Sequence, residues 1–149
     1  MRADRRATVA AWRASAAQDL RIAKVLAETE ANAACFHAQQ AAEKALKAAA
    51  VVALDDVART HVLTTLLDEL RGAELAVDEA VAAAARVLDR YYAPTRYPDA
   101  VGDIDPARLF ALADAQEAVA YAETVLRFTD ALVAASFGEE PVGEGERES

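Results

Sequence analysis

Apolar and polar positions recur with a helical period along most of this chain. Between Ala3 and about Thr29, apolar residues return every three or four positions, which is the spacing of one face of an α-helix. The apolar positions of this stripe are Val9, Trp12, Ala16, Leu20, Ala23 and Ala27. The pattern predicts a first long helix, with Trp12 as an anchor in the core or at an interface rather than a ligand-stacking group.

The second predicted helix runs from about Asn32 to Leu54 and has two contrasting faces. Its stretch Cys35–Val51 contains neither glycine nor proline, which favours an uninterrupted helix. One broad face is apolar and mostly small: Ala34, Cys35, Ala38, Ala41, Ala42, Ala45, Leu46 and Ala49. At about 100° per residue, a polar set falls within an arc of about 80°: His37, Gln40, Lys44 and Lys47. We therefore expect a packing seam and a cluster of hydrogen-bond donors that faces away from it.

A short third helix is predicted after a connection over Asp55–Arg59. Thr60 is a suitable N-cap residue, because its hydroxyl oxygen can accept a hydrogen bond from a backbone N–H of the first turn. The helix should end at Arg71-Gly72, with Gly72 in the left-handed conformation that glycine adopts without strain.

Prolines delimit the last two predicted helices. The fourth runs from about Leu75 to Tyr92, and Pro94 and Pro98 then impose an extended turn. The fifth begins at Asp105-Pro106, where an acidic cap precedes a proline, and ends at about Phe137. Long helices with short links pack as antiparallel bundles. The predicted fold is all-α, an up-and-down antiparallel bundle of about five helices, with a four-helix-bundle core plus a short helix.

Composition supports one helical domain over residues 3–137. Apolar residues make up 54% of the chain, many of them alanine, whereas aromatic residues make up only 6%. Strands favour β-branched and aromatic residues, so this composition favours helices. Residues 138–149 are rich in Gly and Glu and are predicted to form a disordered acidic tail, because they cannot bury enough apolar surface to order themselves.

The formal net charge of −9 argues against general nucleic-acid binding, which requires a clearly positive surface. The charge is unevenly distributed, however. The tail contributes −4, whereas the first 24 residues contain six Arg or Lys against Asp4 and Asp19. A local basic surface is therefore compatible with the acidic total.

Several classes of site are excluded or disfavoured by missing motifs. The single cysteine, Cys35, precludes an internal disulfide and is expected to be a small buried hydrophobic residue. No Glu is followed by His three residues later, so a ferritin-like metal centre is not expected, and no metal site is predicted. Phosphate loops and serine-hydrolase elbows are absent. No apolar run approaches the ~20 residues of a membrane span, so the default expectation is a cytoplasmic protein.

The remaining candidates for chemistry are cations and hydrogen-bonding groups from three places. They are His37, Gln40, Lys44 and Lys47 on the second helix, Arg59 and His61 after it, and Arg90, Tyr91, Arg96, Tyr97 and Asp99 after the fourth helix.

Two interpretations of these residues stay open. In the functional one, the cations converge on a phosphate-bearing ligand, and Tyr91 or Tyr97 offers a stacking surface. In the structural one, Lys44 and Lys47 form a solvated face paired with Glu43 or other acids, and Arg96 and Asp99 hold a turn together. His61 follows the predicted cap and is expected to be a structural group of the first turn rather than a catalytic base.

Several motifs and their order along the chain resemble the HEPN domain. The family name abbreviates a nucleotide-binding domain of higher eukaryotes and prokaryotes. The motifs are Trp12, Asp19-Leu20 and Ala23, then FHAQQAAEKALKA over Phe36–Ala48, then Thr60-His61 with Leu63 and Leu66, then YYAPTRYPDA over Tyr91–Ala100. The resemblance extends from about Arg5 to Phe137, and the QQAAEKALKA and RYPDA blocks together make it fairly specific. It implies a bundle of about five helices that dimerises side by side.

The resemblance implies two functional types. Some HEPN domains are metal-independent endoribonucleases, often toxins, marked by an Arg and, after four to six residues, a His at the dimer interface. Others partner a small nucleotidyltransferase or bind nucleotides, as is thought for the domain in sacsin. In this chain the positions that would hold the Arg are Asp56, Asp55 and Leu54 before His61, and Asn32, Ala31 and Glu30 before His37. The ribonuclease motif is missing, and no general base is visible.

The leading hypothesis is a non-catalytic HEPN-type homodimer that binds a nucleotide or a nucleotidyltransferase partner through a basic cleft. A nucleoside triphosphate is the candidate ligand, and no catalytic residue is assigned. The nucleotide-binding candidates are His37, Gln40, Lys44, Lys47, Tyr91, Arg96, Tyr97 and Asp99. One alternative is a divergent, toxin-like ribonuclease that uses His61 or His37. Another is a structural adaptor or antitoxin-like dimer.

Overall fold

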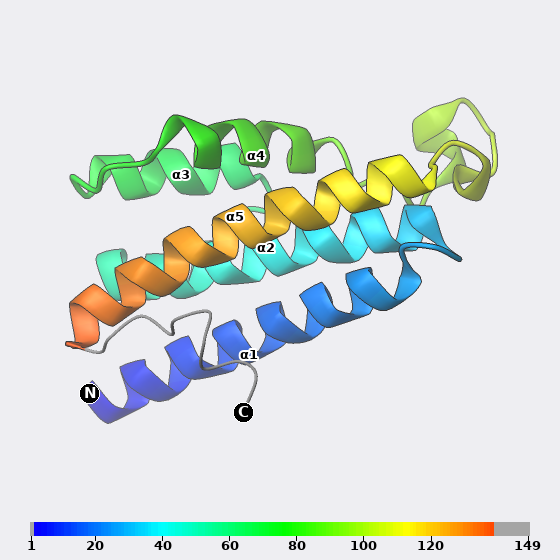
Figure 1. The fold of residues 1–149 in the computed structure, drawn as a ribbon. Helices are drawn as coiled ribbons and strands as arrows, with labels where there is room; N and C mark the ends of the chain where they lie inside the picture. The colour runs from blue at the N-terminus through cyan, green and yellow to red at the C-terminus, as the bar shows by residue number, and fades with distance from the viewer. Residues whose placement is uncertain (1, 139–149) are drawn as a thin grey trace.

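The computed structural model describes residues 2–138 and shows five α-helices and two 3-10 helices there, without strands (Figure 1). The elements are α1 (Arg2–Leu26), α2 (Ala31–Leu54), α3 (Leu63–Gly72), α4 (Glu79–Asp89), η1 (Pro98–Val101), η2 (Pro106–Arg108) and α5 (Leu112–Phe137). The predicted all-α bundle is confirmed. The predicted tail lies outside the described residues, apart from Gly138. None of the helices described is long and apolar enough to cross a bilayer.

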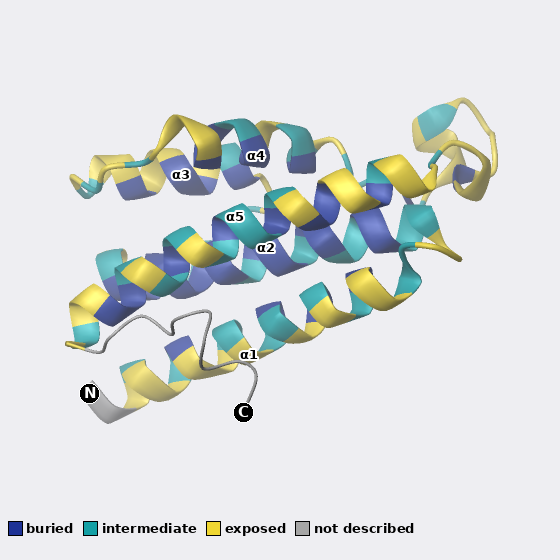
Figure 2. Cartoon of the chain, viewed as in Figure 1, coloured by how far each residue is buried: buried dark blue, intermediate teal, exposed yellow. Residues whose placement is uncertain are grey.

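The bundle is built around α2. This helix packs along both α1 and α5 and also contacts α3 and α4 (Figure 1). Consecutive long helices run in opposite directions, first α1 against α2 and later α4 against α5. Every residue of the predicted small apolar face of α2 is buried (Figure 2). Small side chains shorten the distance between helix axes, so α2 can be enclosed on several sides at once.

The apolar stripe of α1 packs as predicted. Val9, Ala16 and Ala23 are each at most 1% exposed, and the opposite side of the helix faces solvent (Figure 2). Trp12 packs at the edge of a smaller core cluster that contains Val9 and Val133, which confirms it as a core anchor.

The first turn of α3 is capped by a residue distant in sequence. α3 begins at Leu63, and the Thr60 hydroxyl accepts a hydrogen bond from the N–H of Val62, which precedes the helix. The carboxylate of Asp89, at the end of α4, accepts hydrogen bonds from the N–H of Leu63 at 2.6 Å and of Thr64 at 3.2 Å. The Thr64 hydroxyl donates to the same carboxylate at 2.9 Å. The predicted Thr60 cap is therefore wrong, because a tertiary contact supplies the partner.

Four other helix ends also differ from the prediction. Gly72 is the last residue of α3, and Glu74 is the residue with positive φ, at 65°. α4 spans only Glu79–Asp89, so both of its ends lie inside the predicted range. At Asp105-Pro106 the chain forms only η2, in which the Asp105 carboxylate accepts from the N–H of Ala107, and α5 starts later. The cap-and-proline signal marks a helical turn but does not fix its length.

Cys35 is enclosed in the core. Burial, with smaller contributions from Asp114 and Glu117, raises the pKa of its thiol to about 12. The side chain is fully buried and therefore neutral at physiological pH. This confirms it as a small buried hydrophobic residue.

Candidate functional site

The first polar cluster lies between α1 and α2 and is centred on Asp19. Nζ of Lys44 lies 2.6 Å from Oδ2 of Asp19 and donates a hydrogen bond to the Ser15 hydroxyl at 2.8 Å. Nδ1 of His37 lies 2.9 Å from Oδ1 of Asp19. Asp19 is only 6% exposed, so its charge is met by Lys44 and by His37 rather than by solvent.

The second polar cluster lies between α2 and the chain that leads into α3, and is centred on Glu43. Nζ of Lys47 donates to Oε2 of Glu43 at 3.1 Å and lies 5.6 Å from the centroid of the Trp12 ring. Nδ1 of His61 lies 3.2 Å from each oxygen of Glu43. Glu43, which is 3% exposed, therefore binds one Lys and one His, as Asp19 does.

These contacts correct the expected orientation of the polar arc of α2. Lys47 is buried, and the Lys44 side chain is only 26% exposed, so the donors do not form a cluster that faces open solvent. Lys47 pairs with Glu43, as expected if these lysines serve a structural role, but the pair is buried rather than exposed to solvent. The physical reason is that α1 and the 55–62 connection cover this side of α2, and buried charges need partners.

Two glutamines extend the Glu43 cluster. Gln39 is fully buried and donates to Oε1 of Glu43 and to the backbone carbonyl of His61, both at 3.3 Å. Gln40 donates to Oε1 of Gln39 at 2.7 Å. The network ties the connection after α2 to the helix itself, so His61 is held from its backbone as well as from its ring.

A different environment surrounds Arg96, in the turn after α4. Its guanidinium carbon lies 4.1 Å from the ring centroid of Phe36, 4.6 Å from that of Tyr92 and 4.7 Å from that of Tyr97. Nε and Nη2 donate to the carbonyl of Tyr92 at 2.9 and 2.7 Å. Arg96 therefore holds its turn through Tyr92. Asp99 is exposed in η1.

The two candidate stacking tyrosines lie in different surroundings. Tyr91 packs edge-on against Phe110, with ring centroids 5.8 Å apart, and belongs to the edge of the main core. Its burial raises the pKa of its hydroxyl to about 12, with help from nearby acids. Tyr97 is half-exposed and lies beside Arg96. Of these two tyrosines, Tyr97 is the one whose ring lies next to a cation.

A pocket of about 570 Å³ opens beside this cluster, and we call it the His61 pocket. Its lining residues are Thr60, His61, Val62, Asp89, Arg90, Tyr92, Ala93 and Pro94. The rings of His61 and Tyr92 stack with centroids 4.9 Å apart and planes at 18°. Tyr92 also contacts Arg96, so this ring connects the wall of the pocket to the aromatic cluster around that arginine.

The predicted residues are thus joined by a run of contacts rather than gathered in one cleft. The His37 ring lies edge-on to the Phe36 ring, with centroids 5.5 Å apart, and the guanidinium of Arg96 lies over the Phe36 ring. Lys44 is linked to His37 because both contact Asp19. Lys47 is linked to His61 because both contact Glu43. Tyr91 and Asp99 stand apart from this run.

Sequence reasoning did not single out Asp19, Glu43, Phe36 or Tyr92 as site residues. The Glu43–Lys47 spacing of four was the one local signal. The Asp19 and Tyr92 contacts cross between elements and leave no mark in local spacing.

The arrangement has defined chemical capabilities. Each His directs Nδ1 at a buried carboxylate, so Nε2 is the ring nitrogen left to exchange a proton or a hydrogen bond. Arg96 forms no ion pair with any residue of 2–138, and its hydrogen bonds there go only to uncharged oxygens. Among the described residues, no group of three or more His, Cys, Asp or Glu side chains could hold a metal ion.

Comparison with known proteins identifies the family. The family model of the HEPN domain matches residues 9–132. The chain belongs to the HEPN domain family. The resemblance in the QQAAEKALKA and RYPDA blocks is thereby confirmed.

Two solved structures are similar to this HEPN domain. One is TT1696 from Thermus thermophilus, at 38% identity and a TM-score of 0.78, covering 83% of this chain and 97% of that one. The other is ST0689, an archaeal HEPN homologue, at 28% identity and a TM-score of 0.71, covering 84% of this chain and 97% of that one. Comparison with curated proteins finds no match.

Proposed function

We propose that this HEPN domain acts without catalysis, as a homodimer that binds a nucleotide or a nucleotidyltransferase partner. A nucleoside phosphate is the ligand that its chemistry favours. The main support for this proposal is the environment of Arg96. Its guanidinium has no carboxylate partner among the described residues, and it lies over three aromatic rings beside the His61 pocket. Guanidinium groups bind phosphate oxygens, and aromatic rings stack on bases.

The three cations proposed as phosphate contacts are not equally accessible. Lys47 is buried against Glu43, so a ligand could reach it only by breaking that pair. Lys44 is partly exposed, but Asp19 offsets its charge. Arg96 donates only to uncharged oxygens, namely the carbonyl of Tyr92 and, at 3.5 Å, the hydroxyl of Tyr97. Arg96 is therefore the cation best placed to hold a phosphate.

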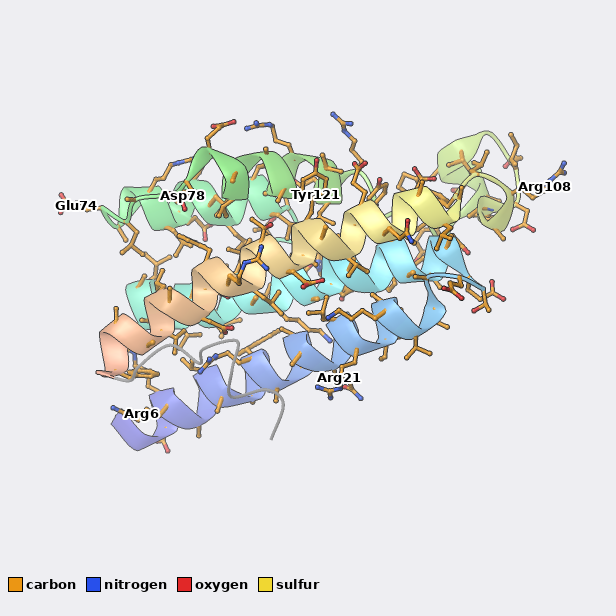
Figure 3. The ribbon with its side chains drawn as sticks, in the orientation of Figure 1. Arg6, Arg21, Glu74, Asp78, Arg108 and Tyr121 are labelled. Atoms are coloured by element: carbon orange, nitrogen blue, oxygen red, sulfur yellow. The ribbon has the colours of Figure 1, made fainter. Side chains whose placement is uncertain are left out.

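A thermal-shift titration with ATP, GTP and a short RNA tests this proposal. A ligand that binds only the folded state raises Tm, and the rise grows with the ratio of its concentration to Kd. We expect ATP or GTP to raise Tm and Arg96→Ala to weaken nucleotide binding about tenfold or more, because a charged hydrogen bond is lost. Arg108→Ala is the matched control, since Arg108 points away from the bundle (Figure 3).

Two results would reject the proposal. One is the absence of any nucleotide-dependent shift in a well-folded sample. The other is equal nucleotide affinity in folded Arg96→Ala and Arg108→Ala variants. The first result, in a clean dimer, would favour the structural adaptor.

One observation favours a divergent ribonuclease as the second candidate. The Asp19–His37 pair has the form of a carboxylate-oriented general base, and the His37 side chain is 29% exposed. Metal-free cleavage of RNA that disappears in His37→Ala would support it. Intact RNA after incubation with the wild-type protein alone would exclude it.

Four large apolar side chains between residues 97 and 112 are exposed, and we take them as support for a homodimer. These are Tyr97, Ile104, Leu109 and Leu112, each between 42% and 50% exposed. Large apolar side chains gathered on a surface often mark a protein interface. Light scattering during the titration would measure the oligomeric state.

A further inference from the structure

We infer that the His61 pocket receives the base of a nucleoside phosphate, with Arg90 as a phosphate contact in addition to Arg96. This inference rests on the proposed function and assigns the base to a pocket outside the nucleotide-binding set that was predicted from the sequence. Neither Val62, Arg90 nor Tyr92 belongs to that set. The volume of about 570 Å³ is within the range of small-ligand sites.

The walls of the pocket suit a flat, largely apolar group. Tyr92 and His61 supply a pair of stacked rings, and Val62, Ala93 and Pro94 supply aliphatic surface. Val62 is 45% exposed. His61 and Arg96 both lie over the Tyr92 ring, so the ring surface left for a base is the outer face of His61. A base stacked there would cover this apolar surface and displace water from it.

The His61 ring also offers a directional polar contact. Glu43 holds Nδ1, so the ring orientation is set, and Nε2 remains, in the plane of the ring, for a hydrogen bond with the ribose or phosphate. Lys47 offsets the charge of Glu43, so the carboxylate behind the ring does not repel an anion strongly. The ring is therefore pre-oriented before a ligand arrives.

Arg90 is the cation in the lining of the pocket. Asp89 is the only acid in the lining, and both of its oxygens are engaged by the first turn of α3. Arg90 is exposed and forms no ion pair with any described residue. The Asp89 carboxylate keeps its charge, which the N-terminal N–H groups of α3 offset in part. Arg90 is therefore the group of the lining that can hold a phosphate, and a neutral aromatic ligand would not use it.

Chemical-shift mapping with AMP, adenosine and inorganic phosphate locates the ligand in the unmodified protein. We expect AMP to shift the amide signals of residues 60–62 and 89–93, adenosine to shift the same signals at higher concentration, and phosphate alone to have the weakest effect. AMP-induced shifts confined to other segments would overturn the inference.

Two substitutions test the same point by affinity. Val62→Glu places a carboxylate at the pocket and should weaken AMP binding at least about tenfold by repelling the phosphate. Val25→Glu is its control, since Val25 is 76% exposed on α1 and does not line the pocket. Arg90→Ala should weaken AMP several-fold while leaving adenosine almost unchanged, with Arg108→Ala as control.

The outcomes separate the pocket from the general function. If the wild-type protein binds AMP, but Val62→Glu and Arg90→Ala have the same AMP affinity as their control variants, the pocket assignment is wrong while nucleotide binding remains supported. If wild-type protein binds no nucleotide at all, both fail. Circular dichroism verifies that each variant is folded, and both substituted side chains are exposed, so folding should be retained.

Discussion

The two polar regions of this molecule contain similar residues in opposite situations. Along α2, Asp19 and Glu43 each bind one Lys and one His, and both carboxylates are nearly inaccessible. At the end of α4, Arg90 and Arg96 have no carboxylate partner in the described chain. The comparison shows that cations in the sequence are not equivalent, because burial forces internal pairing in one region and not in the other.

The largest effect is expected from Glu43→Ala, in the buried region. The substitution leaves Lys47 buried without its counter-charge and removes the acceptor of His61 and Gln39. Breaking one side of a buried pair costs about 3–5 kcal/mol of unfolding free energy. Urea denaturation measures the loss. A double substitution, Glu43→Met/Lys47→Met, should recover a large part of it, and a loss below about 1 kcal/mol in Glu43→Ala would show that the network is unimportant.

A smaller loss is expected from Asp89→Ala, which removes the tertiary cap of α3. Losing an N-cap carboxylate costs about 1–2 kcal/mol. Asp105→Ala is the comparison, since Asp105 caps only the short η2, and its effect on urea denaturation should be smaller. Equal losses in the two variants would contradict the assignment of Asp89 as a structural cap.

Lys44→Ala tests the intermediate case, a partly exposed pair. Asp19 would keep His37 but lose its strongest cation, and an under-satisfied buried acceptor costs about 1–3 kcal/mol. Lys24→Ala is the control, because the Lys24 side chain is 52% exposed and lies 3.8 Å from Glu123. We expect urea denaturation to show a clear loss for Lys44→Ala and almost none for Lys24→Ala.

The smallest effect is expected at the exposed Glu79–Arg86 pair. A hydrogen bond and the charge of Arg86 lower the pKa of Glu79. The pair therefore stabilises the fold above the ordinary carboxyl pKa, and this contribution is lost as pH falls through the lowered value. Because the pair is on the surface, Glu79→Gln should change Tm little at neutral pH, and salt should abolish the difference. A large salt-insensitive change would contradict this.

The site was harder to predict than the fold. The apolar period located all five helices, because each must bury one stripe of side chains. The cap at α3 was missed because its acceptor, Asp89, lies 26 residues from Leu63. Lys47 was assigned to a solvent-facing arc because the period of α2 does not reveal that α1 and the 55–62 connection cover that side.

The sequence by itself determined the helical class, the small-residue seam of α2 and membership of a family, since each depends on local pattern or on motifs in a given order. Only the tertiary structure decided which cations are paired with a carboxylate, which tyrosines contact a cation and where a pocket opens. Those outcomes depend on contacts between helices distant in sequence, and burial by a neighbouring helix decides whether a charge meets a protein partner or water.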